Sequence, residues 1–303
     1  MEIQTVLFRL LPVLTALAIA SFVEVLLPLR RQSRRANGRL ATNLWLLAIT
    51  LTLGTLLNFT LALGAAYVGQ SGLGLLQLLG LGAIASFIIA LVALDGATYL
   101  AHRLLHRMPL LWRVHVVHHI DAAVDATTAF RQHPIEGVVR FGFIAVTALA
   151  LGAPPIAIAV YRLLGALNAV LEHANIRVPP ALDRALVWLW VTPDMHKVHH
   201  SRERIETDSN YANLFSFFDR LCGTFTPSAR GPLVRYGING HDSPEQQSIS
   251  AVLRLPFRGL DFPAPAVAAI ADAAGESNDR RGQARNFDNV GSRSSRTAGG
   301  RHG

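Results

Sequence analysis

Histidines are concentrated in three short stretches of this sequence. Eight of the twelve histidines follow two spacings, H-x-x-x-H once and H-x-x-H-H twice. These eight are His102 and His106, then His115, His118 and His119, and finally His196, His199 and His200. Residues three or four positions apart lie on one face of an α-helix, so each stretch is expected to point its imidazoles in one direction.

Clustered imidazoles predict a metal site. Neutral imidazole is the commonest metal-ligating side chain in proteins, and eight such ligands exceed the four that one tetrahedral zinc ion takes. Two metal ions are therefore predicted. Imidazole suits zinc, copper, iron and nickel alike, so the ligands alone do not choose among them. Cys222 is the only cysteine, which excludes an intrachain disulfide and a competing thiolate cluster.

The composition predicts a membrane protein. Hydrophobic residues make up 51% of the 303-residue chain and charged residues only 16%. Apolar runs recur at about the twenty-residue length that spans a bilayer as a helix. The net charge of +8 would also suit nucleic acid. Because the arginines lie beside the apolar runs and near the C-terminus, lipid headgroups are the predicted counter-charge, and no nucleic-acid partner is expected.

The apolar segments predict a topology. Residues 6–29 lack the basic start and cleavage site of a signal peptide, so they are predicted to remain as a helix. The arginine-rich residues 30–39 follow, and the positive-inside rule places them in the cytoplasm. The segment 42–68 then crosses outward. The segment 75–100 returns and brings the first histidine stretch to the cytoplasmic side.

A further apolar stretch, residues 137–171, is interrupted at residues 152–155. Two consecutive prolines there cannot continue a helix, so a helical hairpin is predicted, either spanning or re-entrant. Both alternatives return the chain to the side it left. His173 is therefore predicted to lie on the same face as the three histidine stretches.

The predicted fold is all-α, a polytopic membrane helical bundle with a cytosolic helical cap that carries the histidines. Three regions are predicted. They are residues 1–74 with the N-terminal transmembrane helices and basic loop, residues 75–260 as the catalytic membrane domain, and residues 261–303 as a disordered basic tail.

The location of the histidines narrows the chemistry. Ligands at the cytoplasmic ends of membrane helices lie beside lipid, which suggests a hydrocarbon substrate. Attack on an unactivated C–H bond requires dioxygen and a redox metal, and iron offers one-electron chemistry with open coordination positions. A di-iron oxygenase is therefore inferred.

Asp95 is the predicted catalytic partner of these ligands. It precedes His102 by seven residues and His106 by eleven, so a continuous helix would place all three on one stripe. Ligating histidines usually donate their second N–H to a carboxylate or carbonyl, and an acid in an apolar segment is costly unless it serves a site. The alternative is a purely structural role for Asp95.

The remaining histidines are less clear from spacing. His173 follows an apolar arm and is either a ligand or an interfacial histidine. His133 precedes a proline and is either a ligand or only a turn residue. His241 and His302 lie among polar residues and are not expected to bind metal.

The sequence resembles the fatty acid hydroxylase and sterol desaturase superfamily of membrane di-iron enzymes. The three histidine stretches match its pattern, and so do the residues around them. These are Leu-Trp-Arg at 111–113, Arg-Gln-His-Pro-Ile-Glu at 131–136, His-Ala-Asn-Ile at 173–176, Thr-Pro-Asp-Met at 192–195, Asn-Tyr-Ala-Asn at 210–213 and Asp-Arg-Leu-Cys-Gly-Thr-Phe at 219–225. The resemblance covers about half of the chain.

The resemblance implies a function and its partners. The eight histidines, with His173 as a ninth, would bind two irons, for which zinc can substitute in purified protein. The enzyme would use dioxygen to hydroxylate or desaturate a fatty acyl or sterol-like lipid. Electrons would come from a separate ferredoxin or b-type cytochrome.

Two other classes of protein fit the histidines. A non-enzymatic membrane protein could use them to bind a metal or haem, in which case a haem protein would absorb strongly in the visible. A membrane zinc hydrolase would act without oxygen or reductant.

Overall fold

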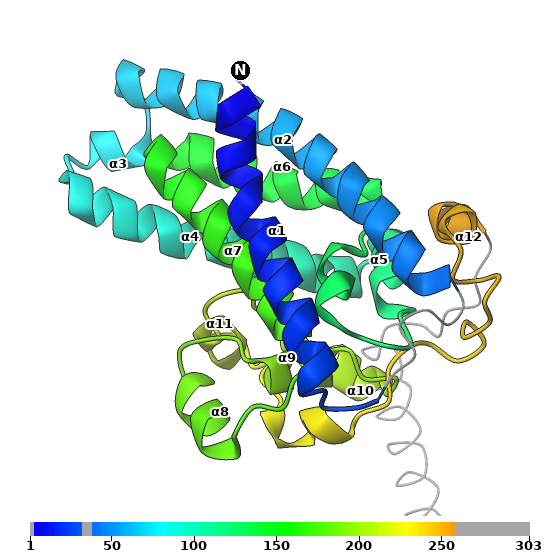
Figure 1. Cartoon of the computed structure of the whole chain (residues 1–303). Coiled ribbons are helices and arrows are strands. Elements are labelled where there is room, and N and C mark those ends of the chain that lie inside the picture. The colour runs from blue at the N-terminus through cyan, green and yellow to red at the C-terminus, as the bar shows by residue number, and fades with distance from the viewer. Residues whose placement is uncertain (1–2, 32–37, 259–303) are drawn as a thin grey trace, which may run out of the picture. The chain divides into compact units, whose positions relative to one another are not determined.

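The computed structural model describes residues 3–31 and 38–258 (Figure 1). These residues form twelve α-helices joined by turns and short 3-10 helices, and they contain no β-strand beyond two isolated bridges. The predicted all-α fold is confirmed. The predicted disorder of residues 261–303 lies outside the described residues.

Five long helices form a bundle. They are α1 (Ile3–Leu26), α2 (Arg39–Ser71), α4 (Ala83–Arg107), α6 (Pro134–Leu151) and α7 (Pro155–His173). Four stretches are long and apolar enough to cross a membrane, namely α2 continuing into α3 (Leu75–Leu78), then α4, α6 and α7. In α1, residues Leu10–Leu26 form a shorter apolar helix. A multi-pass membrane bundle is therefore what these residues build.

The bundle packs around a small apolar core. Helix α4 contacts both α6 and α7, α2 packs on α6, and α1 lies along α7 (Figure 1). Leu94, Ile144 and Tyr161 meet in the core between these helices. Many large apolar side chains instead face outward, as Leu56 and Val146 do. Such an outer surface suits contact with lipid more than with water.

The third apolar segment is not one helix. The segment predicted at residues 75–100 is divided by a turn between α3 and α4, and the apolar helix that could span a membrane is Ala83–Arg107. Gly80 has φ of 63° in this turn, a left-handed conformation that glycine adopts without strain. Helix α4 starts afresh at Ala83 and continues to Arg107, so the first histidine stretch lies within its last two turns.

The predicted hairpin is present. Helix α6 ends at Gly152, whose φ is 63°, and α7 begins at Pro155. A Cβ added to Gly152 would lie 2.8 Å from the Cα of Gly74. Two segments of the bundle can approach this closely only because both positions are glycine.

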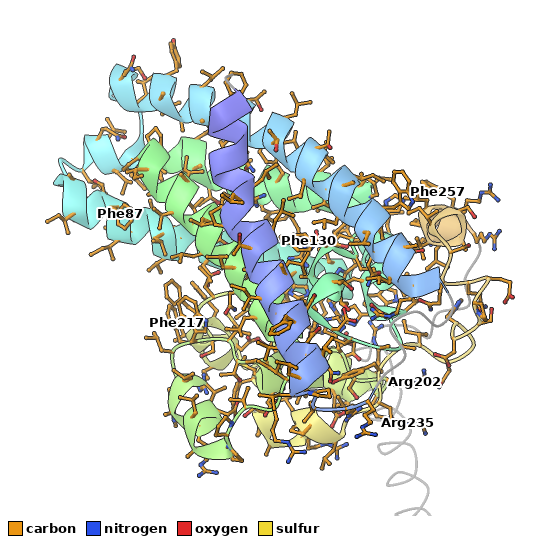
Figure 2. The ribbon with its side chains drawn as sticks, viewed as in Figure 1. Phe87, Phe130, Arg202, Phe217, Arg235 and Phe257 are labelled. Carbon is orange, nitrogen blue, oxygen red and sulfur yellow. The ribbon has the colours of Figure 1, made fainter. Side chains whose placement is uncertain are left out.

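Short helices gather at one end of the bundle. They are α5 (Pro109–His119), α8 (Pro180–Leu186), α9 (Pro193–His199), α10 (Arg204–Thr207), α11 (Phe217–Leu221) and α12 (Ile249–Arg254). Figure 2 shows Arg202 and Arg235 in this region and Phe87 among the long helices. The histidines lie where the two regions meet.

Candidate metal centre

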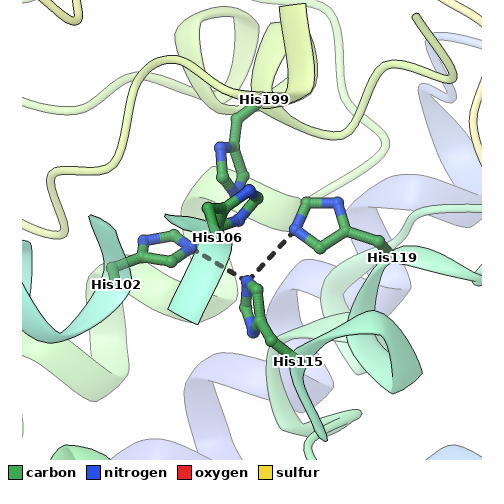
Figure 3. Close-up of side chains that lie close together, drawn as sticks. All are labelled: His102, His106, His115, His119 and His199. Atoms are coloured by element: carbon green, nitrogen blue, oxygen red, sulfur yellow. Dashed lines mark hydrogen bonds between the residues drawn. The ribbon is translucent and has the colours of Figure 1, made fainter. Parts of the chain in front are cut away.

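Nine histidines come together in two adjacent groups. The five-histidine group is His102, His106, His115, His119 and His199 (Figure 3). The four-histidine group is His118, His173, His196 and His200. Within each group the candidate ligand nitrogens lie within 4.8 Å of one another. No ring of the nine is more than 4% exposed, so water does not solvate them freely.

Each of the two H-x-x-H-H stretches contributes two histidines to one group and one histidine to the other. On α5, His115 and His119 are one turn apart and face the five-histidine group, whereas His118 faces the other group. Helix α9 and its C-cap residue do the reverse, because His196 and His200 belong to the four-histidine group and His199 belongs to the larger one. Each of these helices therefore belongs to both groups.

The other two helices serve one group each. Helix α4 supplies His102 and His106 to the five-histidine group, and α7 ends with His173 in the four-histidine group. The groups are in contact, since the rings of His119 and His200 stack with centroids 4.7 Å apart. Two ions bound there would be close neighbours.

Outward hydrogen bonds fix the orientation of the rings in the five-histidine group. The Nδ1 of His102 donates to the Tyr211 carbonyl at 2.8 Å, and that of His199 donates to the Ser209 carbonyl at 2.7 Å. The Nδ1 of His115 donates to Glu136 Oε1 at 2.9 Å. Since Nδ1 carries the proton, each Nε2 has a free lone pair turned toward the group's centre.

The same arrangement occurs in the four-histidine group. The Nδ1 of His118 donates to the Arg131 carbonyl at 3.2 Å, and that of His173 donates to the Ala169 carbonyl at 2.7 Å. Carbonyl partners of this kind set the tautomer of metal-ligating histidines.

The inward nitrogens fit a cation. The Nε2 atoms of His102 and His115 lie 3.1 Å apart, as do those of His118 and His173. Two lone pairs facing each other at that distance repel unless a positive charge lies between them. Nitrogens that share one ion at about 2.0–2.1 Å would themselves lie roughly 2.9–3.4 Å apart. The buried Nε2 atoms of His106 and His199 also have no hydrogen-bond partner.

Three carboxylates that the sequence prediction missed lie against these histidines. Glu136 accepts from His115 and also from Arg140 Nε at 2.8 Å. Asp208 lies 3.3 Å from His106 Nδ1. The Oε1 of Glu172 is 3.8 Å from His196 Nε2. Glu136 and Glu172 flank the apolar stretch 137–171, so an acid beside an apolar segment was the signal that could have found them.

Asp95 lies elsewhere. Its carboxylate accepts from the backbone N–H groups of Leu214 at 3.1 Å and Phe215 at 2.8 Å, and its hydrogen bonds within the described residues include no histidine. Asp95 and His102 do share one face of α4, as the spacing predicted. They are seven residues apart, however, which is about 10 Å along the helix. Asp95 instead holds the loop whose Tyr211 carbonyl receives His102.

The remaining histidines stay outside both groups. His133 caps α6, with Nδ1 accepting from the Ile135 N–H at 3.2 Å and Nε2 facing the Leu253 carbonyl at 3.3 Å. Both of its nitrogens are thus engaged. His241 lies in the segment between η3 (Ser228–Leu233) and α12, and His302 lies outside the described residues.

A buried polar network supports α5 from behind. Arg131 is fully buried, and its guanidinium donates to the Val117 carbonyl at 3.0 Å, to Asn43 at 2.9 Å and to Gln247 at 2.8 Å. Arg39 pairs with Asp121 at 2.9 Å in the same network. Because the Arg131 carbonyl also accepts the hydrogen bond from His118 Nδ1, these contacts fix the position of the His118 ring.

Burial sets the protonation of the histidines on α5 and α9. It is the main cause that lowers the pKa of each of them, and in most of them repulsion from neighbouring rings adds to the effect. They are His115, His118, His119, His196, His199 and His200. These rings are neutral at pH 7, which is the form that binds a metal.

A pH dependence of stability follows for the metal-free protein. Its free energy of unfolding should have its full value above the ordinary histidine pKa of about 6.5, and it should fall as the pH drops below that pKa. The unfolded chain takes up protons there that the folded chain excludes. Melting temperatures of chelator-treated protein in detergent, measured from pH 8 downward, test this. A His241→Ala variant should show the same fall, and a melting temperature that stays constant to about pH 5 would contradict the prediction.

Comparisons with known proteins agree with the geometry. Residues 87–224 match the family model described as fatty acid hydroxylase, which confirms the resemblance predicted from the sequence. The ornithine lipid hydroxylase OlsE of Rhizobium tropici is 31% identical over 158 residues, which are 50% of this chain and 45% of that protein. The human alkylglycerol monooxygenase is 30% identical over 151 residues, 49% of this chain and 32% of that protein.

A more distant relative has a different activity in its name. The very-long-chain aldehyde decarbonylase GL1-1 of Oryza sativa subsp. indica is 31% identical over 145 residues, 45% of this chain and 23% of that protein. The chain spans less than half the length of these curated relatives. No solved structure matches it significantly.

Proposed function

We propose that this chain, whose residues 87–224 match the family model described as fatty acid hydroxylase, is a membrane oxygenase that uses two irons to oxidise a C–H bond of a lipid. One observation supports this most strongly. Nine buried imidazoles form two touching groups, and hydrogen bonds at Nδ1 turn the Nε2 lone pairs inward. The relatives named as a lipid hydroxylase and a monooxygenase point to the same class of substrate.

The metal ions would be held by His102, His106, His115, His119 and His199 in one group and by His118, His173, His196 and His200 in the other. Bound iron would supply the one-electron chemistry that makes dioxygen reactive toward a C–H bond. In hydroxylation, the lipid C–H, dioxygen, two electrons and two protons give a C–OH group and water. Desaturation uses the same oxidant and electrons and removes two hydrogens from the lipid.

The protein's own groups have supporting roles in this proposal. Glu136 and the carbonyls of Tyr211, Ser209 and Arg131 hold the rings in one tautomer. Burial keeps water away from the reacting centre. The electrons are proposed to come from a separate ferredoxin or b-type cytochrome. The arginines of residues 30–39 favour the cytoplasmic face for the centre.

Iron loading and lipid mass together test the proposal. The metal-free protein, given ferrous iron without oxygen, should bind about two ions per chain, one for each histidine group. Lipids from cells that express the protein should then contain a product heavier by one oxygen atom, or lighter by two hydrogen atoms, that is missing without it. Activity that persists without oxygen would favour a zinc hydrolase. A strong visible haem band with unaltered lipids would favour a non-enzymatic haem protein.

A further inference from the structure

A cavity inside the bundle lies next to the metal centre. It has a volume of about 170 Å³ and is lined by α2, α4, α6, α7 and the turn before α6. One water needs roughly 10–15 Å³ on this measure, so the cavity takes a ligand of many atoms. Its wall includes Ala169, whose carbonyl accepts a hydrogen bond from His173 Nδ1. It also includes Thr98, which lies one turn before His102 on α4. A molecule in the cavity is therefore one layer of residues from the histidines.

Most of the cavity wall is apolar, but two arginines also line it. Leu53 and Leu57 of α2 line it, as do Phe141 and Ile144 of α6. Arg140 and Arg162 contribute the positive charge. An apolar wall with a few convergent polar groups is typical of a site for an amphiphilic small molecule.

Arg162 has no acidic partner within the part of the chain that the structure describes. Its buried Nε has no hydrogen-bond partner, and no ion pair among the described residues includes it. It lies seven residues after the start of α7 and eleven before His173, so it is about 10 Å and 16 Å from the two helix ends. A charged side chain near the middle of a membrane helix is costly unless it meets an opposite charge.

Arg140 extends this positive charge toward the histidines. Its Nε donates to Glu136 at 2.8 Å, and Glu136 in turn receives His115. The guanidinium has five N–H donors, and its hydrogen bonds to other described residues engage only Nε. Planar guanidinium groups match the oxygens of carboxylates and phosphates.

We propose that this cavity binds the anionic head group, a carboxylate or a phosphate, of a lipid whose hydrocarbon chain lies against α2 and α6. This inference rests on the proposed function, lipid oxidation. It narrows the proposed substrates to acidic lipids. With the head group near Arg140 and Arg162, the carbon atoms next to the head group would be the part of the chain nearest to the metal centre. Oxidation near the head group, rather than at the distal end of the chain, follows from this placement.

Binding to the purified full-length protein in detergent tests the site without turnover. Hexadecyl phosphate and hexadecanoate, in their ionised forms, should bind about 10–100-fold more tightly than hexadecan-1-ol, because each gains charge-assisted hydrogen bonds. Arg162→Gln should remove this preference, whereas Arg162→Lys should keep much of it. The matched control is Arg184→Gln, since Arg184 is an exposed arginine on α8.

A second variant tests the location. Gly54 lines the cavity, and a Cβ added there meets nothing within 4 Å. Gly54→Phe should therefore fill the space and weaken binding of all three probes while both arginines remain. Unchanged binding by this variant would place the ligand elsewhere and overturn the proposal.

The wild-type protein alone can also overturn it. Equal binding of hexadecyl phosphate and hexadecan-1-ol would exclude an anion site, even if every Arg162 variant failed to fold. Displacement of hexadecyl phosphate by an equal concentration of inorganic phosphate would show a simple anion site and not a lipid site. Oxidation of lipids without charge preference would refute this site and leave the proposed function intact. Selective binding of the anionic probes without any lipid oxidation would support this site and refute the proposed function.

Discussion

Replacing His106 by alanine should lower the bound iron from about two ions to about one per chain and abolish lipid oxidation. His106 is on α4, which supplies only the five-histidine group, so the four-histidine group keeps all of its ligands. His173→Ala should give the reciprocal result, because α7 supplies only the four-histidine group. Iron analysis of purified protein, together with an oxidation assay, measures both outcomes.

His241→Ala is the control for this pair, since His241 lies outside both groups. It should retain two irons and full activity. The two single variants should also be recovered from membranes in amounts similar to the wild type, because neither ring is in the apolar core of the bundle. Either variant holding two irons with normal activity would show that the ring it lacks is not a ligand.

Glu136→Gln should weaken metal binding or activity by about 10–100-fold, the usual effect of removing a carboxylate that orients a ligating histidine. The amide is nearly the same size but lacks the negative charge that His115 Nδ1 and Arg140 Nε both contact. The loss should fall on the five-histidine group, which contains His115. Competition with a chelator of known affinity would report the binding of each ion.

Glu203→Gln provides the matched comparison, since Glu203 is exposed and directly precedes the short helix α10. It should bind metal as the wild type does. If Glu136→Gln also matched the wild type in metal affinity and activity, the carboxylate would serve only the packing of α6.

The sequence predicted the helices and their histidines for a simple physical reason. Helical spacing and apolar length are local properties, so the break between α6 and α7 and the clustering on α4 could be inferred without knowing any tertiary contact. The resemblance to the fatty acid hydroxylase family added His173, whose position beside the other rings depends on where α7 ends.

The division of the rings into five and four was beyond sequence reasoning. It depends on how α5 and α9 face each other, and spacing says nothing about the crossing of two helices. The partners of the rings were equally hidden, since several are backbone carbonyls such as those of Tyr211 and Ser209. Asp95 illustrates the converse error, because a shared helical face does not bring residues together when two turns separate them.

The reciprocal use of α5 and α9 bears on how the protein matures. Each group requires segments separated by about a hundred residues, so neither can form until the last of them, α9, has been synthesised and has docked. Until a cation arrives, the facing lone pairs of His102 and His115 push their helices apart. With iron as the proposed metal, its binding would be a late step of biogenesis that completes the packing of this end of the protein, and cells starved of iron should accumulate a chain that is inserted but locally open to proteolysis.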